Sequence, residues 1–357
     1  VGAAEGQEEG ASTLVLAWGE SGSMLAVWAL GALAGAALLT RLVLFRARDG
    51  RERYAGRHVV VTGGSQGIGR VLAEEFFKLG AKVTIMARTK AKLDKAVEEI
   101  VAANQGASGL GEIKAVAADV TDIASVQMAM QQAVDLQAGL PIFSLILSAG
   151  RAVPGYFLDQ DAEVFRNSMA VNYLGPVNCA KVVAPLMLSK GTKGEIVFVS
   201  SAVASAAFIG YASYAPTKAA LRSFSDALRN ELKGTGISVH IAYPPDTDTP
   251  GFEEENKTKP KETLEISPPE VYSAKKVSDS ILDGLLRGEY HLPSPDLVQN
   301  LLISTSVNVT PRGRWALLEI MLGPILSVVM LAFGWNAGRI ASGYGRRVAA
   351  ELKSRDD

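Results

Sequence analysis

Segments patterned as β-strands alternate with segments patterned as helices from residue 58 to residue 243. The strand-like runs are short, β-branched and apolar along their length, as in Val59-Val60-Val61. Helices between such strands are the crossovers of a parallel sheet that is buried on both faces. The predicted strands are 58–62, 82–87, 112–118, 143–147, 196–200 and 238–243, and the predicted helices are 68–79, 89–104, 121–137, 172–188 and 214–233. We expect an α/β fold, a doubly wound parallel sheet with ligands at the carboxyl ends of its strands.

The composition limits the class of protein. The chain has 357 residues, with 36 Lys and Arg against 37 Asp and Glu, and its net charge of −1 argues against a nucleic-acid binder. A hydrophobic content of 48% excludes a mostly disordered chain. The single cysteine, Cys179, excludes an intramolecular disulfide, and with three histidines we expect no metal site. These features suit a reducing compartment such as the cytosol.

The amino-terminal region differs from the middle of the chain. Residues 1–23 are polar and acidic, whereas 24–45 are apolar apart from Arg41 and are long enough to cross a bilayer. The residues that follow are basic, with Arg46, Arg48, Arg51, Arg53 and Arg57. We expect a membrane anchor with the rest of the chain in the cytosol. The alternative is a signal peptide, which would carry its basic residues before the apolar run.

Residues 297–357 form a second unusual region, an apolar segment with a basic tail. Its most apolar stretch, 315–335, has a tryptophan at each end, one charge at Glu319 and a proline at Pro324. Basic residues flank this stretch on both sides, so their distribution does not predict how it would be oriented in a membrane. We expect a membrane-associated segment that spans, folds back as a re-entrant hairpin at Pro324, or lies in the interface. The alternative is a buried core helix or a dimer helix.

A glycine-rich loop, T-G-G-S-Q-G-I-G at 62–69, joins the first predicted strand to the first helix. Its glycines allow a tight turn, a close approach of backbone to a pyrophosphate, and close packing of helix on strand. Phosphates then lie at a helix amino terminus, where free N–H groups favour anions. The strand before and the helix after support a Rossmann-type dinucleotide site. The loop residues expected to hold the cofactor are Gly63, Ser65, Gln66, Gly67, Ile68 and Gly69.

The end of the second strand indicates which dinucleotide binds. An acid there would bind the ribose hydroxyls of NAD, whereas a basic residue accommodates the extra phosphate of NADP. This chain has Arg88 in that position and Lys92 one turn later, and Ser65 can add a hydroxyl. We therefore expect NADPH as the cofactor. Asp119 and Val120 follow the third strand, where a carboxylate can meet the adenine amino group.

A candidate catalytic group lies near the fifth strand. Tyr214 and Lys218 are four residues apart, which places both side chains on one face of a helix. A nearby ammonium favours the phenolate and lowers the phenol pKa, and such a tyrosine can give a proton to a ketone oxygen. Ser201 ends the fifth strand and can polarise the same carbonyl. Its neighbour Ser200 should point to the opposite face.

Together these motifs resemble the short-chain dehydrogenase/reductase family over about 57–251. The resemblance implies that Tyr214 is the acid, that Lys218 orients the nicotinamide ribose, and that Ser201 holds the carbonyl. It adds Asn172 as a fourth catalytic member, which links Lys218 to a proton-relay water.

The chain departs from the family pattern in two places. The usual N-N-A-G is here Leu147-Ser148-Ala149-Gly150, and we expect its Ser148, Ala149 and Gly150 to pack on the cofactor in an altered way. The usual P-G after the sixth strand is replaced by Pro244-Pro245. The backbone contacts that the family makes at this position are therefore less firmly expected in this chain. Thr249 is still placed to meet the nicotinamide amide.

The segment 242–252, A-Y-P-P-D-T-D-T-P-G-F, resembles the 3-ketodihydrosphingosine reductases of that family, as does the order of anchor, reductase core and apolar end. The resemblance implies an endoplasmic reticulum membrane enzyme whose catalytic domain, 57–296, faces the cytosol. Its substrate would be a long-chain keto-sphingoid lipid taken from the bilayer. Residues 251–296 would form a substrate lid. The substrate ammonium could meet the acids Asp246, Asp248, Glu253, Glu254 and Glu255, although a solvated loop explains the three glutamates as well.

Two other functions stay open at this point. The first is a membrane reductase of the same family that acts on a steroid or retinoid. The second is a non-catalytic NADPH-binding scaffold, against which the complete set of catalytic residues argues. The family resemblance also allows a homo-oligomer, paired through the helices before the fifth and sixth strands or through the apolar carboxyl end.

Overall fold

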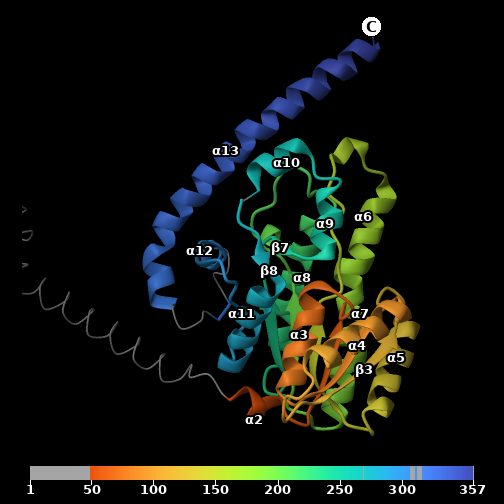
Figure 1. Ribbon diagram of the computed structural model, residues 1–357. Coiled ribbons are helices and arrows are strands. Elements are labelled where there is room, and N and C mark those ends of the chain that lie inside the picture. Colours follow the sequence, from red (N-terminus) through yellow and green to blue (C-terminus); the bar gives the residue numbers. More distant parts are fainter. Residues whose placement is uncertain (1–48, 268, 306–309, 312–315, 357) are drawn as a thin grey trace, which may run out of the picture.

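The computed structural model describes residues 49–267, 269–305, 310–311 and 316–356. The acidic segment 1–23 and the expected anchor 24–45 lie outside the described residues. The described chain forms a Rossmann-type α/β domain with a long carboxyl-terminal helix beside it (Figure 1).

A seven-stranded parallel sheet forms the centre of the domain, in the order β3-β2-β1-β4-β5-β6-β9. Its strands are β1 (His58–Thr62), β2 (Lys82–Ala87), β3 (Glu112–Ala117), β4 (Ile142–Leu147), β5 (Glu195–Val199), β6 (Ser238–Ala242) and β9 (His291–Leu292). The first six agree with the predicted strands to within about one residue at each end. The strand order reverses between β1 and β4, which is the point where such sheets bind ligands.

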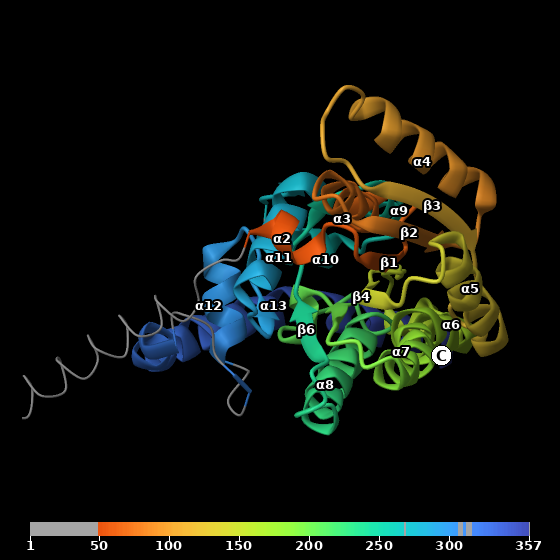
Figure 2. The same ribbon diagram turned by 90° about the horizontal axis from the view of Figure 1, so that it is seen from below.

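Helices cover both faces of the sheet, as Figure 2 shows from below. One face carries α3 (Gly67–Lys78), α4 (Lys90–Ala103) and α11 (Ala274–Arg287), and the other carries α5 (Ile123–Leu136), α7 (Gly175–Ser189) and α8 (Ala215–Glu231). On α3 the side chains of Leu72 and Phe76, one turn apart, are fully buried against the sheet. Each such burial contributes roughly 1.5–3 kcal/mol, so this apolar stripe fixes the helix that follows the glycine loop.

Three elements differ from the predictions. The helix expected over 172–188 begins earlier, as α6 (Ala162–Met169), and passes through a π-helical turn, η2 (Ala170–Leu174), into α7. β9 is an additional strand that pairs with β6 and was not predicted. α11 lies in the segment expected to be a lid, but its apolar face, including Val277 and Ile281, is buried in the core. From that segment, the catalytic cleft is lined by residues of α9 (Pro250–Asn256), whereas the next helix, α10 (Lys261–Ile266), does not line it.

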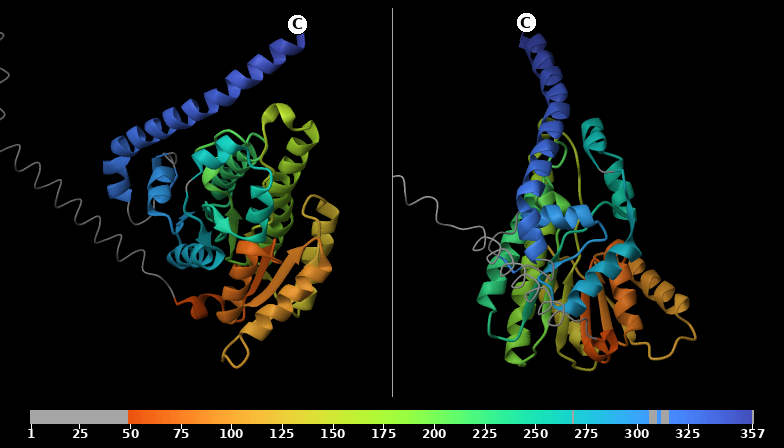
Figure 3. Two further views of the ribbon diagram at one scale, coloured as in Figure 1. Left: turned by 45° about the horizontal axis from the view of Figure 1, so that its top comes forward. Right: turned by 90° about the vertical axis from the view of Figure 1, so that its left-hand side faces the viewer.

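Two further helices follow the sheet. α12 (Leu297–Thr305) packs on α13 (Ala316–Asp356), which also contacts α10 and runs across the domain (Figure 3). α13 is helical through Pro324, so the re-entrant hairpin is wrong. Its segment Glu319–Glu351 is long and apolar enough to cross a membrane, with a mean hydropathy of 1.7, and 6% of the apolar window is buried. The buried core helix is therefore also wrong, because most of this apolar surface faces outward.

The amino ends of the strands carry a buried polar cluster. Glu195, the first residue of β5, is fully buried and accepts hydrogen bonds from the Tyr54 hydroxyl at 2.8 Å and the Ser144 hydroxyl at 2.9 Å. It also pairs with Arg53, one of the arginines expected to be part of a juxtamembrane basic cluster. α2 (Gly50–Tyr54), which carries both Arg53 and Tyr54, is thus fixed at the edge opposite to the carboxyl ends of the strands.

Candidate active site

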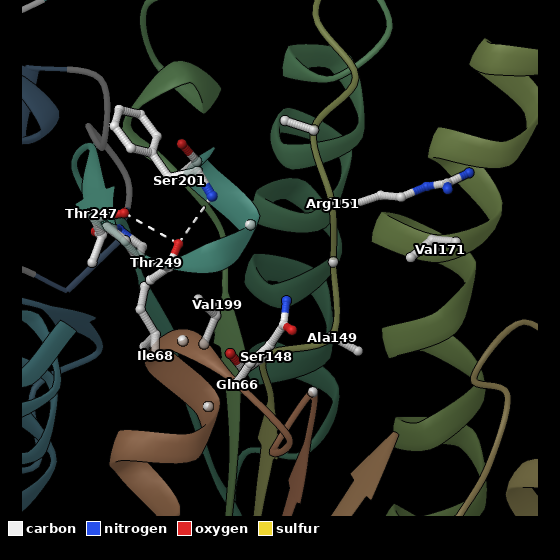
Figure 4. A pocket seen from close by; sticks show the side chains of 18 of the residues that line it. Gln66, Ile68, Ser148, Ala149, Arg151, Val171, Val199, Ser201, Thr247 and Thr249 are labelled. Carbon is white, nitrogen blue, oxygen red and sulfur yellow. Dashed lines mark hydrogen bonds between the residues drawn. The ribbon is translucent and has the colours of Figure 1, made fainter. Parts of the chain in front are cut away.

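A cleft of about 370 Å³ opens at the carboxyl ends of the central strands (Figure 4). All predicted site residues except Asn172 line it. From the cofactor prediction these are Gly63, Ser65, Gln66, Gly67, Ile68, Gly69, Arg88, Lys92, Asp119, Val120, Ser148, Ala149, Gly150 and Thr249, and from the catalytic prediction Ser201, Tyr214 and Lys218. Residues that lie far apart in the sequence therefore meet at one site.

The glycine loop has the shape of a phosphate cradle. Gly63 has a φ of +71°, and a Cβ atom there would lie 2.8 Å from the Ala149 nitrogen. A Cβ atom at Gly69 would lie 2.5 Å from the Gly63 carbonyl oxygen. Within the described structure Gln66, which precedes α3, gives the first turn no side-chain cap. The N–H groups of that turn are thus open to an anion in the cleft, which fits the pyrophosphate of a dinucleotide.

Basic and acidic side chains lie at the other end of the cleft, beyond β2 and β3. Arg88 and Lys92 line it, as expected for a site that takes an additional phosphate. The Asp119 carboxylate accepts hydrogen bonds from the Thr121 backbone N–H at 2.9 Å and from its hydroxyl at 2.8 Å. The first of these bonds is the main contribution that lowers the pKa of Asp119, and the charge of Arg88 lowers it further. Asp119 is therefore ionised.

The candidate catalytic side chains come from β5 and α8. Tyr214 precedes the first turn of α8 and Lys218 lies one turn later, with its ammonium 5.7 Å from the Tyr214 ring centre. The Lys218 ammonium donates a hydrogen bond to the Val199 carbonyl at 2.9 Å. Ser201 faces the cleft and is hydrogen bonded to Tyr214. Ser200 also lines the cleft, but its hydroxyl is engaged with α8, where it donates to the Lys218 carbonyl at 3.0 Å.

The pKa of Tyr214 differs from the expectation drawn from the sequence. We expected Lys218 to lower it, but burial and the negative charge of Glu255 raise it above the ordinary value of a phenol, and the bond to Ser201 offsets only part of that rise. Burial also lowers the pKa of Lys218 to about 8. Tyr214 is thus a protonated phenol near neutral pH, which suits a group that gives a proton to a carbonyl oxygen.

Asn172 lies behind the cleft rather than in its wall. It is fully buried in the π-helical turn η2, and its amide exchanges two hydrogen bonds with the Arg151 backbone, both at 2.9 Å. A Cβ atom at Gly150 would lie 3.1 Å from the Asn172 oxygen and 3.3 Å from the Lys218 nitrogen. Gly150 therefore allows these two side chains to approach the same backbone segment.

Thr249 caps α9. Its hydroxyl accepts from the Phe252 backbone N–H at 3.1 Å and donates to the Thr247 carbonyl at 3.2 Å (Figure 4). A Cβ atom at Gly67 would lie 3.2 Å from the Thr249 methyl group. The cap therefore fixes α9 against the glycine loop across the cleft.

The five acids expected near the substrate divide into two groups. Asp246 and Glu255 line the cleft, whereas Asp248, Glu253 and Glu254 are exposed and do not. Glu255 accepts a hydrogen bond from the Tyr211 hydroxyl at 2.5 Å. It also forms an ion pair with Lys259, at 3.1 Å between the charged atoms. Burial raises the pKa of Asp246 and Glu255 raises it further, while Lys259 lowers it. Two of the three glutamates, Glu253 and Glu254, are therefore solvated, as the alternative proposed, although they lie on the helix α9 and not in a loop.

Several lining residues were missed by the sequence reasoning. Tyr211, Val199, Val171 and Thr247 all face the cleft. Val199 could have been found, because it lies next to the carboxyl end of the predicted strand 196–200, where ligands of such sheets bind. Val171 directly precedes Asn172, and Thr247 lies in the segment 242–252, but no chemical role pointed to either side chain.

Comparison with known proteins gives consistent results. The sequence profile of the short chain dehydrogenase family matches residues 57–260. A 3-ketodihydrosphingosine reductase of Dictyostelium discoideum is 36% identical over 82% of this chain and 90% of its own. A 3-ketodihydrosphingosine reductase of Bos taurus is 37% identical over 66% and 70%, and a 3-dehydrosphinganine reductase of Arabidopsis thaliana is 33% identical over 84% and 88%.

Solved structures match the fold. A short chain dehydrogenase/reductase from Burkholderia phymatum in complex with NAD has a TM-score of 0.60 at 20% identity, over 67% of this chain and 89% of that one. An alcohol dehydrogenase from Thermococcus sibiricus complexed with 5-hydroxy-NADP has a TM-score of 0.54 at 21% identity, over 64% and 90%. The architecture around the cleft is thus one that holds nicotinamide dinucleotides in other proteins.

Proposed function

Because this chain belongs to the short-chain dehydrogenase family and is an oxidoreductase, we propose a specific reaction for it. It reduces 3-ketodihydrosphingosine to dihydrosphingosine with NADPH. The observation that carries the proposal is the convergence of Ser201, Tyr214 and Lys218 on one cleft in a chain similar to such reductases along most of its length. The reaction belongs to sphingolipid biosynthesis.

The cleft fits the cofactor. The open N–H groups after Gln66 and the close approach allowed at Gly63 and Gly69 would hold the pyrophosphate. Arg88 and Lys92 would hold the additional phosphate that distinguishes NADPH from NADH. When bound, NADPH supplies the hydride that reduces the keto carbon.

The side chains of the chain itself then manage the charge on the carbonyl oxygen. Tyr214 donates its proton to that oxygen, and its raised pKa keeps the proton available. Ser201 donates a hydrogen bond to the same oxygen as negative charge develops there. The Lys218 ammonium orients the nicotinamide ribose and stabilises the phenolate that remains on Tyr214. Asn172 holds the Arg151 backbone beside it and completes the path by which a water returns a proton.

The substrate is a long-chain amine, and two features of the cleft suit it. Asp246 and Glu255 are two acids that share one cation, Lys259, so the group keeps negative charge beside the catalytic residues, where it attracts the ammonium of the lipid. The outward face of α13 carries large apolar side chains that suit contact with a bilayer, among them Ile325, Val328, Leu331 and Trp335. We further propose that the protein resides in the endoplasmic reticulum membrane, anchored by 24–45, with its catalytic domain facing the cytosol.

The proposal is tested by NADPH oxidation with detergent-solubilised protein and 3-ketodihydrosphingosine. NADH and a steroid ketone serve as controls. We expect oxidation that requires the sphingoid ketone and prefers NADPH. Activity on the steroid alone would keep the chemistry and refute the substrate. NADPH binding without oxidation of any ketone would favour a non-catalytic scaffold.

A further inference from the structure

A second chamber, of about 290 Å³, joins the catalytic cleft. The two share Ser201, Val203, Tyr211 and the segment 244–246, so the chamber opens beside the proposed carbonyl site. Its far wall comes from α12 and α13, through Val298, Leu302, Ile303, Met330 and Phe333. Apart from the residues shared with the cleft, no residue of this chamber has a role in the proposed mechanism.

A series of aromatic rings connects the catalytic phenol to α13. The ring centres of Tyr214 and Tyr211 are 5.9 Å apart, those of Tyr211 and Phe208 are 5.2 Å apart, and those of Phe208 and Phe333 are 6.3 Å apart. Phe208 and Phe333 are both chamber residues. A row of aromatic rings in contact therefore connects the catalytic residue to the long helix.

The two ends of the chamber differ in polarity. Of the three acids that line the chamber, Asp246 is the one shared with the cleft, whereas Glu270 and Asp296 do not line the cleft, and α13 presents Met330 and Phe333. A ligand with one charged end and one apolar chain would lie with the amine near Asp246 and the chain toward α13. The reverse orientation would place the apolar chain at the charged catalytic residues and move the ketone away from Ser201.

α13 is held over the chamber by contacts farther along the helix. Tyr344 stacks on Tyr156 with ring centres 4.0 Å apart, and Arg347 pairs with Glu262 of α10. The Tyr156 hydroxyl donates to Glu262 at 2.5 Å. These contacts orient the helix so that Met330 and Phe333 face inward while their neighbour Leu331 is 74% exposed.

We propose that this chamber binds the aliphatic chain of the lipid ketone, with α13 as the wall between the chain and the bilayer. The proposal rests on the proposed function for the identity of the ligand. What it adds is the position of the aliphatic chain, which lies against α12 and α13 and not along the cofactor cleft. A helix apolar on both faces is suited to this position, because one face meets lipid and the other meets substrate.

The test combines a chamber-filling variant with homologues of the ketone that differ in chain length. Each methylene removed from water should raise kcat/KM by about fourfold in the natural protein. Leu302→Trp fills the chamber from α12, so it should lower kcat/KM for the long-chain ketone by about tenfold or more and leave the shortest homologue within about twofold, since the shortest homologue does not reach α12. NADPH affinity and thermal unfolding report whether the variant is folded.

Leu331→Trp is the matched control, because it adds the same side chain to the exposed face of α13 beside Met330. It should leave the dependence on chain length unchanged. Equal losses for long and short homologues in Leu302→Trp, or equal effects of the two variants, would overturn the chamber assignment while the proposed function stands.

A binding measurement separates the two proposals. A pyrene-labelled sphingoid base should bind Leu302→Trp about tenfold more weakly than the natural protein and Leu331→Trp equally well. This result would support the chamber even if no ketone were reduced, in which case only the proposed function fails. Equal binding by all three proteins would overturn the chamber.

Discussion

The two sides of the active site are built in different ways. The cofactor side is formed by loops that directly follow β1, β2, β3 and β4, and its contacts are backbone N–H groups and charged side chains such as Arg88. The chamber side is formed by segments that follow β5 and β6, together with α12 and α13, and it is mostly apolar. The first side depends on local geometry, whereas the second depends on how distant helices pack.

This difference has a physical consequence for substitutions. A cradle made from backbone at Gly63 and Gly69 accepts no side chain, because the surrounding backbone atoms lie within 3 Å of a Cβ there. An apolar chamber tolerates changes of shape at a cost set by the apolar area that is lost. Changes on the cofactor side should therefore alter chemistry and cofactor choice, and changes on the chamber side should alter which lipid is accepted.

The largest effect should come from Tyr214, at the boundary between the two sides. Tyr214→Phe removes the proton donor and should lower kcat by about 10²- to 10⁴-fold, with the NADPH dissociation constant within about twofold of the natural value. Stopped-flow NADPH oxidation and fluorescence titration measure the two quantities. Near-normal turnover would refute the mechanism.

Cofactor choice should change next. Removing both basic side chains, in Arg88→Ala with Lys92→Ala, should lower the preference for NADPH over NADH by about 10- to 100-fold, because charge-assisted bonds to phosphate are lost. The dependence on lipid chain length should stay unchanged, since neither residue touches the chamber. A preference that survives the double substitution would place the additional phosphate elsewhere.

The pH profile tests the charge of Lys218. Burial lowers its pKa to about 8, so the ammonium is intact below that pH and is lost above it. Because the mechanism needs the cation, kcat/KM should fall as the pH rises above about 8, by about tenfold per pH unit. Tyr214 does not contribute to this decline, because its pKa is raised above the ordinary phenol value. A flat profile above that pH would show that the charge of Lys218 is not required.

The smallest effect should be on recognition of the amine. Asp246→Asn should lower kcat/KM for the amino ketone by about fivefold relative to the same ketone without the amino group, as expected for one ion pair that is partly exposed. Glu253→Gln, a change of an exposed acid in the same region, is the control. An equal loss with both ketones would mean that Asp246 stabilises the segment after β6 and does not bind the ammonium of the substrate.

The sequence predicted the cofactor side well and the chamber side poorly. The six predicted strands were found because strands buried on both faces are nearly continuous apolar runs. The glycine loop was found because its spacing has a geometric reason. β9 was missed because two residues carry no pattern, and α11 was assigned to a lid because loop prolines on both sides obscured its apolar face.

The chamber could not be predicted because its residues share no motif. Phe208, Leu302 and Phe333 lie in three segments whose proximity depends on the docking of α13. The direction of the Tyr214 pKa was missed for a related reason. The sequence shows that Lys218 is four residues away, but it does not show that Glu255 and burial act on the same phenol.

The most direct test of the central claim follows the fate of the hydride. The protein is incubated with 3-ketodihydrosphingosine and NADPH deuterated at the reactive nicotinamide carbon, and the lipid product is analysed by mass spectrometry. We predict dihydrosphingosine with one deuterium on the former keto carbon, and at least about 100-fold less of it from Tyr214→Phe after the same incubation time. Recovery of unreduced ketone, with NADPH bound and Tyr214 intact, would contradict the account.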